Sequence, residues 1–97
     1  MRYFFHPAAE AEHLAEVSFY ESRRKGLGAR YLASFGAAIE RACSDPTGFR
    51  IECEPNLRRV LLRGFPFAII FREVHGEVQV LAVAHYKRRP GYWAARI

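Results

Sequence analysis

The sequence has 97 residues, of which 51% are hydrophobic and 26% are charged, and its net charge is +5. These proportions are typical of a small soluble domain, so we expect a single domain over residues 1–97. The longest apolar run, Phe65 to Phe71, has seven residues and contains a proline, so it is too short to cross a membrane. The N-terminal apolar patch lacks the length and cleavage site of a secretion signal, which predicts a cytoplasmic protein.

The positive charge is concentrated in the second half of the chain. Residues 1–57 contain seven Lys or Arg and eight Asp or Glu, which gives −1, whereas residues 58–97 contain eight and two, which gives +6; together they make +5. A potential of this sign favours acidic partners, which are either nucleic acid or an acidic protein segment. Composition alone does not choose between these two classes.

The first half of the chain predicts a strand followed by a helical hairpin. Aromatic residues at positions 2–6 indicate a strand, and Pro7 suits the first turn of a helix. A first helix is expected from Ala8 to Lys25 and a second from Ala29 to Cys43, separated by a glycine turn at residues 26–28. The spacing predicts that the first helix buries Ala11, Leu14, Ala15 and Ser18, and that the second buries Tyr31, Leu32, Phe35, Ala38, Ile39 and Ala42.

The second half predicts an antiparallel meander. Apolar runs at residues 60–62, 67–71 and 78–84 are separated by turns that are too short for crossover helices. Residues 47–57 show no periodicity and indicate a loop, and residues 90–97 are expected to make a short helical turn that folds Tyr92 and Trp93 onto the sheet. The expected fold is therefore α+β, in the order β-α-α-β-β-β, with the helical hairpin packed on one face of the sheet.

Cysteine, histidine and acidic residues give no sign of a metal or cofactor site. Cys43 and Cys53 have no ligand-like spacing, and the four histidines are scattered. The carboxylates of the first helix, Glu10, Glu12 and Glu16, are expected to be solvated. We therefore expect no metal and no cofactor.

Polar and cationic residues gather where the last strand ends, at His85, Tyr86, Lys87, Arg88 and Arg89. A rigid element that ends in such groups is a common location for a binding or catalytic site. Arginines on the preceding strands could add to an anion site; they are Arg59, Arg63 and Arg72. The alternative interpretation is that His85 bonds to the backbone and that the cations form an ordinary solvated surface.

Several segments together resemble the RelE/ParE superfamily of toxins from type II toxin–antitoxin modules, which are also described as plasmid-stabilisation proteins. They are residues 6–12 at the start of the first helix, 20–21 with 26–32 in the helical hairpin, 58–67 in the meander and 81–93 at its end. The last segment is similar to the ParE-like ending of a histidine, arginines, a proline and an aromatic pair. The resemblance covers nearly the whole chain and implies the same β-α-α-β-β-β order.

The resemblance implies a cognate antitoxin as partner, in a toxin–antitoxin hetero-oligomer, and two possible targets. ParE-like members poison DNA gyrase without being enzymes. If this chain is ParE-like, the candidate residues at the end of the last strand and the three arginines, Arg59, Arg63 and Arg72, bind the target. RelE-like members cut messenger RNA on the ribosome, for which the candidates here are Arg63, His85 and Tyr86. Such nucleases commonly carry an arginine early in the middle strand of the meander, and residues 65–69 contain no cation. A gyrase-binding toxin is therefore the first hypothesis, the ribonuclease the second, and a basic nucleic-acid-binding module the third.

Overall fold

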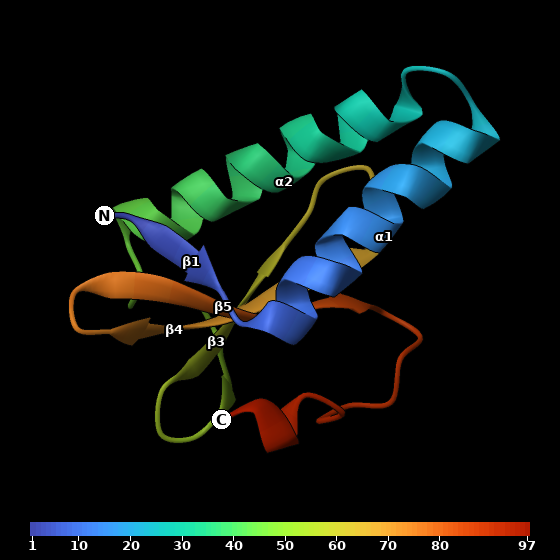
Figure 1. Ribbon diagram of the computed structural model, residues 1–97. Helices are drawn as coiled ribbons and strands as arrows, with labels where there is room; N and C mark the ends of the chain where they lie inside the picture. The colour runs from blue at the N-terminus through green and yellow to red at the C-terminus, as the bar shows by residue number, and fades with distance from the viewer.

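The computed structural model describes all residues, 1–97, and has a helical hairpin above a twisted sheet (Figure 1). The helices are α1 (Pro7–Arg23) and α2 (Leu27–Ser44), and the strands are β1 (Tyr3–Phe5), β2 (Ile51–Cys53), β3 (Leu57–Leu61), β4 (Phe67–Val74) and β5 (Glu77–His85). A short 3-10 turn, η1 (Ala94–Arg96), ends the chain. The expected α+β architecture, with its helical hairpin and C-terminal turn, is confirmed.

The sheet has five strands in the order β1-β5-β4-β3-β2. Strands β3, β4 and β5 form the expected antiparallel meander, and β1 pairs in parallel with β5. The β4–β5 hairpin turns at His75 and Gly76, whose φ angles are 51° and 80°. Positive φ at both central residues is what a two-residue type I′ hairpin turn requires, and Gly76 adopts it without steric cost.

Residues 47–57 are not entirely a loop, which corrects the expectation from sequence. The three residues of β2 pair with β3 at the edge of the sheet in an irregular register. Three residues are too few to show the alternation that predicts a strand. The strand forms by pairing with the free edge of β3.

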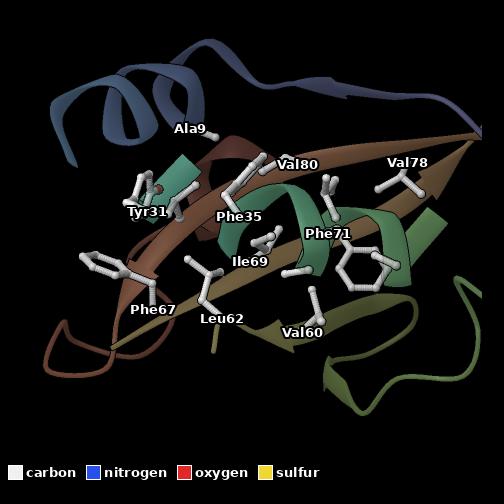
Figure 2. Packing of buried hydrophobic residues seen from close by; sticks show 14 residues of the cluster. Ala9, Tyr31, Phe35, Val60, Leu62, Phe67, Ile69, Phe71, Val78 and Val80 are labelled. Carbon is white, nitrogen blue, oxygen red and sulfur yellow. The ribbon is translucent and has the colours of Figure 1, made fainter. Parts of the chain in front are cut away.

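One face of the sheet packs against the helices, and this layer holds the larger core. Figure 2 shows Phe35 of α2 opposite Ile69 and Val80 of the sheet, with the other members of the cluster between the two layers. The predicted buried face of α2 is confirmed except at Leu32, which is 44% exposed.

The buried face of α1 is not the predicted one. The residues Ala11, Leu14, Ala15 and Ser18 are all exposed. Instead, Ala9 and His13 are buried, and Val17 and Tyr20 pack partly buried against the same core. Both sets of residues recur at helical spacing. The set that faces the sheet was not predicted to be buried, because His13 and Tyr20 carry polar atoms.

The opposite face of the sheet carries a second, smaller core. Its members are Leu57, Ala68, Ile70, Leu81, Ala82 and Trp93. The C-terminal segment, defined here as residues 86–97, runs along this side, away from the helices, as Figure 1 shows in red. The expected return of Trp93 onto the sheet is confirmed, since this residue is 5% exposed.

A β-bulge in β5 changes which of its residues face each core. The register with β4 shifts after the Ile70–Ala82 pair, so that the next pair joins Phe71 to Val80 and skips Leu81. Leu81 and Ala82 consequently both belong to the second core, whereas the flanking valines, Val80 and Val83, belong to the first.

His13 is the one polar side chain in the buried set, at 8% exposure. Its Nδ1 lies 3.1 Å from the hydroxyl of Tyr31, and its ring centroid lies 4.2 Å from that of Phe35. Burial lowers the pKa of His13 from the ordinary value of 6.5, although Glu10 partly offsets this effect. The ring is therefore neutral in the folded protein near neutral pH.

We expect stability to fall as the pH drops below 6.5. The unfolded chain takes up a proton on His13 at a higher pH than the folded chain does, so acid favours unfolding. Thermal denaturation between pH 7.5 and 5.5 should show a falling midpoint, with a weaker dependence in His13→Gln. His75→Asn, in the exposed hairpin turn, is the control and should keep the pH dependence of the parent. An unchanged pH dependence in His13→Gln would contradict this explanation.

Candidate functional site

A pocket of about 100 Å³ lies at the end of β5, on the face of the sheet that the C-terminal segment covers. The floor comes from the strands, at Ala68, Ile70 and Ala84. The residues at its rim and walls are Glu52, Arg59, His85, Tyr86, Arg88, Arg89, Pro90, Tyr92 and Trp93. Five of the eight residues proposed from the sequence therefore border a single pocket, namely Arg59, His85, Tyr86, Arg88 and Arg89.

The charge of this pocket is positive. Its lining contains three arginines and one glutamate, and Glu52 lies 3.5 Å from Arg59 in an ion pair. The guanidinium of Arg88 lies 3.9 Å from the ring centroid of Tyr92, which is a cation–π contact. The pocket combines cations with aromatic walls and therefore suits an anionic group of a partner.

His85 borders this pocket, but its ring makes contacts elsewhere. Its Nδ1 accepts a hydrogen bond from the backbone N–H of Lys87 at 3.0 Å, and its ring centroid lies 5.1 Å from that of Phe67 in a T-shaped arrangement. Phe67 is opposite His85 in the β4–β5 register and belongs to the helix-side core. The backbone-bonding interpretation of His85 is therefore the one that the hydrogen bonds match.

The remaining proposed residues lie outside the pocket. Arg63 follows β3 and borders hollows next to α2, where its carbonyl oxygen accepts a hydrogen bond from the Ser34 hydroxyl. Arg72 lies toward the far end of β4 and donates from Nε to the side chain of Gln79 at 2.9 Å. Lys87 is exposed beside the pocket without lining it. The structure thus does not bring Arg63 together with His85 and Tyr86.

Sequence reasoning missed Glu12, which was expected to be solvated. Its side chain is 16% exposed and forms an ion pair with Arg96, whose Nη2 lies 2.9 Å from Oε2. Burial alone would raise the pKa of Glu12, but hydrogen bonds from Arg96, Val83 and Tyr92 outweigh burial and hold the pKa below its usual value. Glu12 and Arg96 are 84 residues apart, and nothing in the sequence indicates that these two charged residues form a pair.

Glu16, one turn further along α1, has the opposite character. Burial raises the pKa of its carboxyl group, and His85 partly offsets the effect.

No three His, Cys, Asp or Glu side chains converge in an arrangement that could hold a metal ion. Neither helix is long and apolar enough to cross a bilayer.

Comparison with known proteins gives a match at the level of structure. No family model matches the sequence, and no curated protein matches it. A solved chain described as the chromosomal ParDE TA system from P. aeruginosa superposes with a TM-score of 0.64 and 21% sequence identity, over 88% of this chain and 95% of that chain. At this identity the likeness establishes the fold, which is the one that the RelE/ParE resemblance implied: this chain has the fold of a protein from a toxin–antitoxin system.

Proposed function

We propose that this chain is the toxin of a type II toxin–antitoxin module, that it acts in the cytoplasm, and that a cognate antitoxin neutralises it. The observation that carries the proposal is the fold shared with a chain of the ParDE system over nearly the whole length. The sequence resemblance at residues 81–93 supports it as a second observation, and this stretch provides most of the residues that line the pocket at the end of β5.

We further propose that the toxin acts by binding DNA gyrase and not by cutting RNA. An endoribonuclease needs a proton acceptor, a proton donor and a cation directed at one phosphate. Here the His85 ring lies against Phe67 and Arg63 lies outside the pocket, which argues against such a set. A positive pocket with aromatic walls is instead suited to hold a target by contact alone.

Expression of the chain in a bacterial host without antitoxin tests both steps. We expect growth arrest, filamentous cells and a DNA-damage response while incorporation of labelled amino acids at first continues. Co-expression of the neighbouring reading frame should restore growth, because a bound antitoxin would cover the positive pocket. Purified protein should also inhibit supercoiling by gyrase.

Two outcomes would redirect the assignment. An immediate stop in protein synthesis with cuts in messenger RNA would replace the gyrase target by the ribosome and establish the ribonuclease. Normal growth at a verified level of folded protein would contradict the toxin assignment itself and favour the nucleic-acid-binding module.

A further inference from the structure

The carboxylate of Glu12 joins three separate parts of the chain. From α1, Oε1 accepts hydrogen bonds from the backbone N–H of Val83 at 3.0 Å and from Nη1 of Arg96 at 3.0 Å. Oε2 accepts hydrogen bonds from the hydroxyl of Tyr92 at 2.8 Å and from Nη2 of Arg96 at 2.9 Å. One side chain of the helix layer is thus bonded to strand β5 and to the C-terminal segment on the opposite side of the sheet.

This arrangement closes an open edge of β5. The strand β1 ends its pairing at Phe5 and Val80, so the polar backbone groups of β5 beyond Val80 have no strand beside them on that edge. Arg96 donates from Nη1 to the carbonyl oxygen of Leu81 at 2.9 Å, and Glu12 accepts from Val83 as described. Two charged side chains therefore occupy the place of a neighbouring strand, which satisfies the edge and prevents it from pairing elsewhere.

The same carboxylate fixes the wall of the pocket. The hydroxyl of Tyr92 is bonded to Glu12, and its ring lies beneath the guanidiniums of Arg88, at 3.9 Å, and Arg96, at 5.1 Å. The C-terminal segment provides half of the lining residues of the pocket, namely Tyr86, Arg88, Arg89, Pro90, Tyr92 and Trp93. A chain of contacts therefore runs from Glu12 through Tyr92 to Arg88.

We infer that Glu12 is a positioning residue for the pocket at the end of β5: by holding Tyr92 and Arg96 it sets the place of Arg88 and of the segment that carries it. The functional part of this inference rests on the proposed toxin function. Glu12 itself does not line the pocket, so it acts on a bound target only through Tyr92 and the segment. Preorganised cations bind an anionic group more strongly than mobile ones, because the entropy of ordering them has already been lost.

Trp93, the only tryptophan of the chain, reports on this segment directly. It is 5% exposed and lies in the second core. We expect Glu12→Gln, which keeps the size of the side chain but removes its charge, to shift Trp93 emission to longer wavelength and to raise acrylamide quenching several-fold. Far-UV circular dichroism should retain the signal of the helices and sheet. Glu10→Gln is the control and should match the parent, because Glu10 is an exposed residue of the same helix with no side-chain hydrogen bond or ion pair.

Growth after induction without antitoxin provides the second readout, in which Glu12→Gln should lose most of the toxicity and Glu10→Gln none. Tyr92→Phe keeps the ring under Arg88 and removes only the hydroxyl bond to Glu12, so an intermediate loss is expected, and this variant decides the matter if Glu12→Gln does not fold. Parental Trp93 emission and quenching in the folded variants would overturn the inference, as would full toxicity in a variant whose Trp93 is exposed. A parent that is not toxic contradicts the proposed function, while the Trp93 measurement still decides the positioning.

Discussion

Trp93→Ala is expected to lower the free energy of unfolding by about 3–5 kcal/mol, the usual cost of truncating a buried large aromatic residue. The indole is 5% exposed and belongs to a core of six buried residues on the face of the sheet opposite the helical hairpin. Since a change of 1 kcal/mol shifts the midpoint of a domain of this size by about 4–8 °C, the midpoint should fall by more than about 10 °C.

Thermal and urea denaturation of Trp93→Ala and of the parent protein measure this loss of stability. Tyr86→Ala is the matched control, because Tyr86 belongs to the same segment and is 54% exposed, so its truncation should change stability by no more than about 0.5 kcal/mol. If Trp93→Ala were as stable as Tyr86→Ala, the second core would not contribute to folding and the C-terminal segment would be an appendage.

Replacing Lys87, Arg88 and Arg89 together by Ala should abolish toxicity with little loss of stability. All three side chains are exposed, and two of them line the pocket. Removing exposed charges usually changes stability by no more than about 0.5 kcal/mol. The cation–π contact of Arg88 with Tyr92 adds a loss on the order of 0.5–1 kcal/mol.

The control for this variant removes the same number of cations from the other basic run. Arg23, Arg24 and Lys25 lie at the tip of the helical hairpin, and Arg23 makes a similar contact with the ring of Phe19, at 5.6 Å. Their replacement by Ala should leave toxicity intact. Equal loss of toxicity in both variants would mean that net charge, and not the pocket, determines the activity, whereas full toxicity in the first would remove residues 87–89 from the site.

The hydrophobic pattern by itself determined the meander and the second helix. The predicted apolar runs at residues 60–62, 67–71 and 78–84 overlap β3, β4 and β5 and are separated by short turns. Helix α2 has one apolar stripe, so its core face, from Tyr31 to Ala42, could be assigned with a single error at Leu32. In these elements each residue's position depends on its immediate neighbours in the chain.

The cluster at the end of β5 was also visible, because its residues are consecutive, and five of the eight candidates border one pocket. The way in which other strands contribute to the pocket could not be predicted from the sequence. Arg59 reaches the pocket because β3 pairs with β4, whereas Arg63 lies past the end of β3 and borders a different hollow. Spacing along the chain does not show that β3 ends before Arg63, which leaves only Arg59 on the strand beside the pocket.

Tertiary structure alone decided the core face of α1, the parallel pairing of β1, the bulge at Leu81 and the role of Glu12. Each depends on groups far apart in sequence: the ring of His13 is buried because Tyr31 and Phe35 receive it, and the carboxylate of Glu12 leaves water because Arg96 and an open strand edge lie beside it. A polar side chain is placed in the interior only when partners compensate for its lost hydration. The sequence of a helix records which residues are polar, and only the folded chain determines which of them find partners.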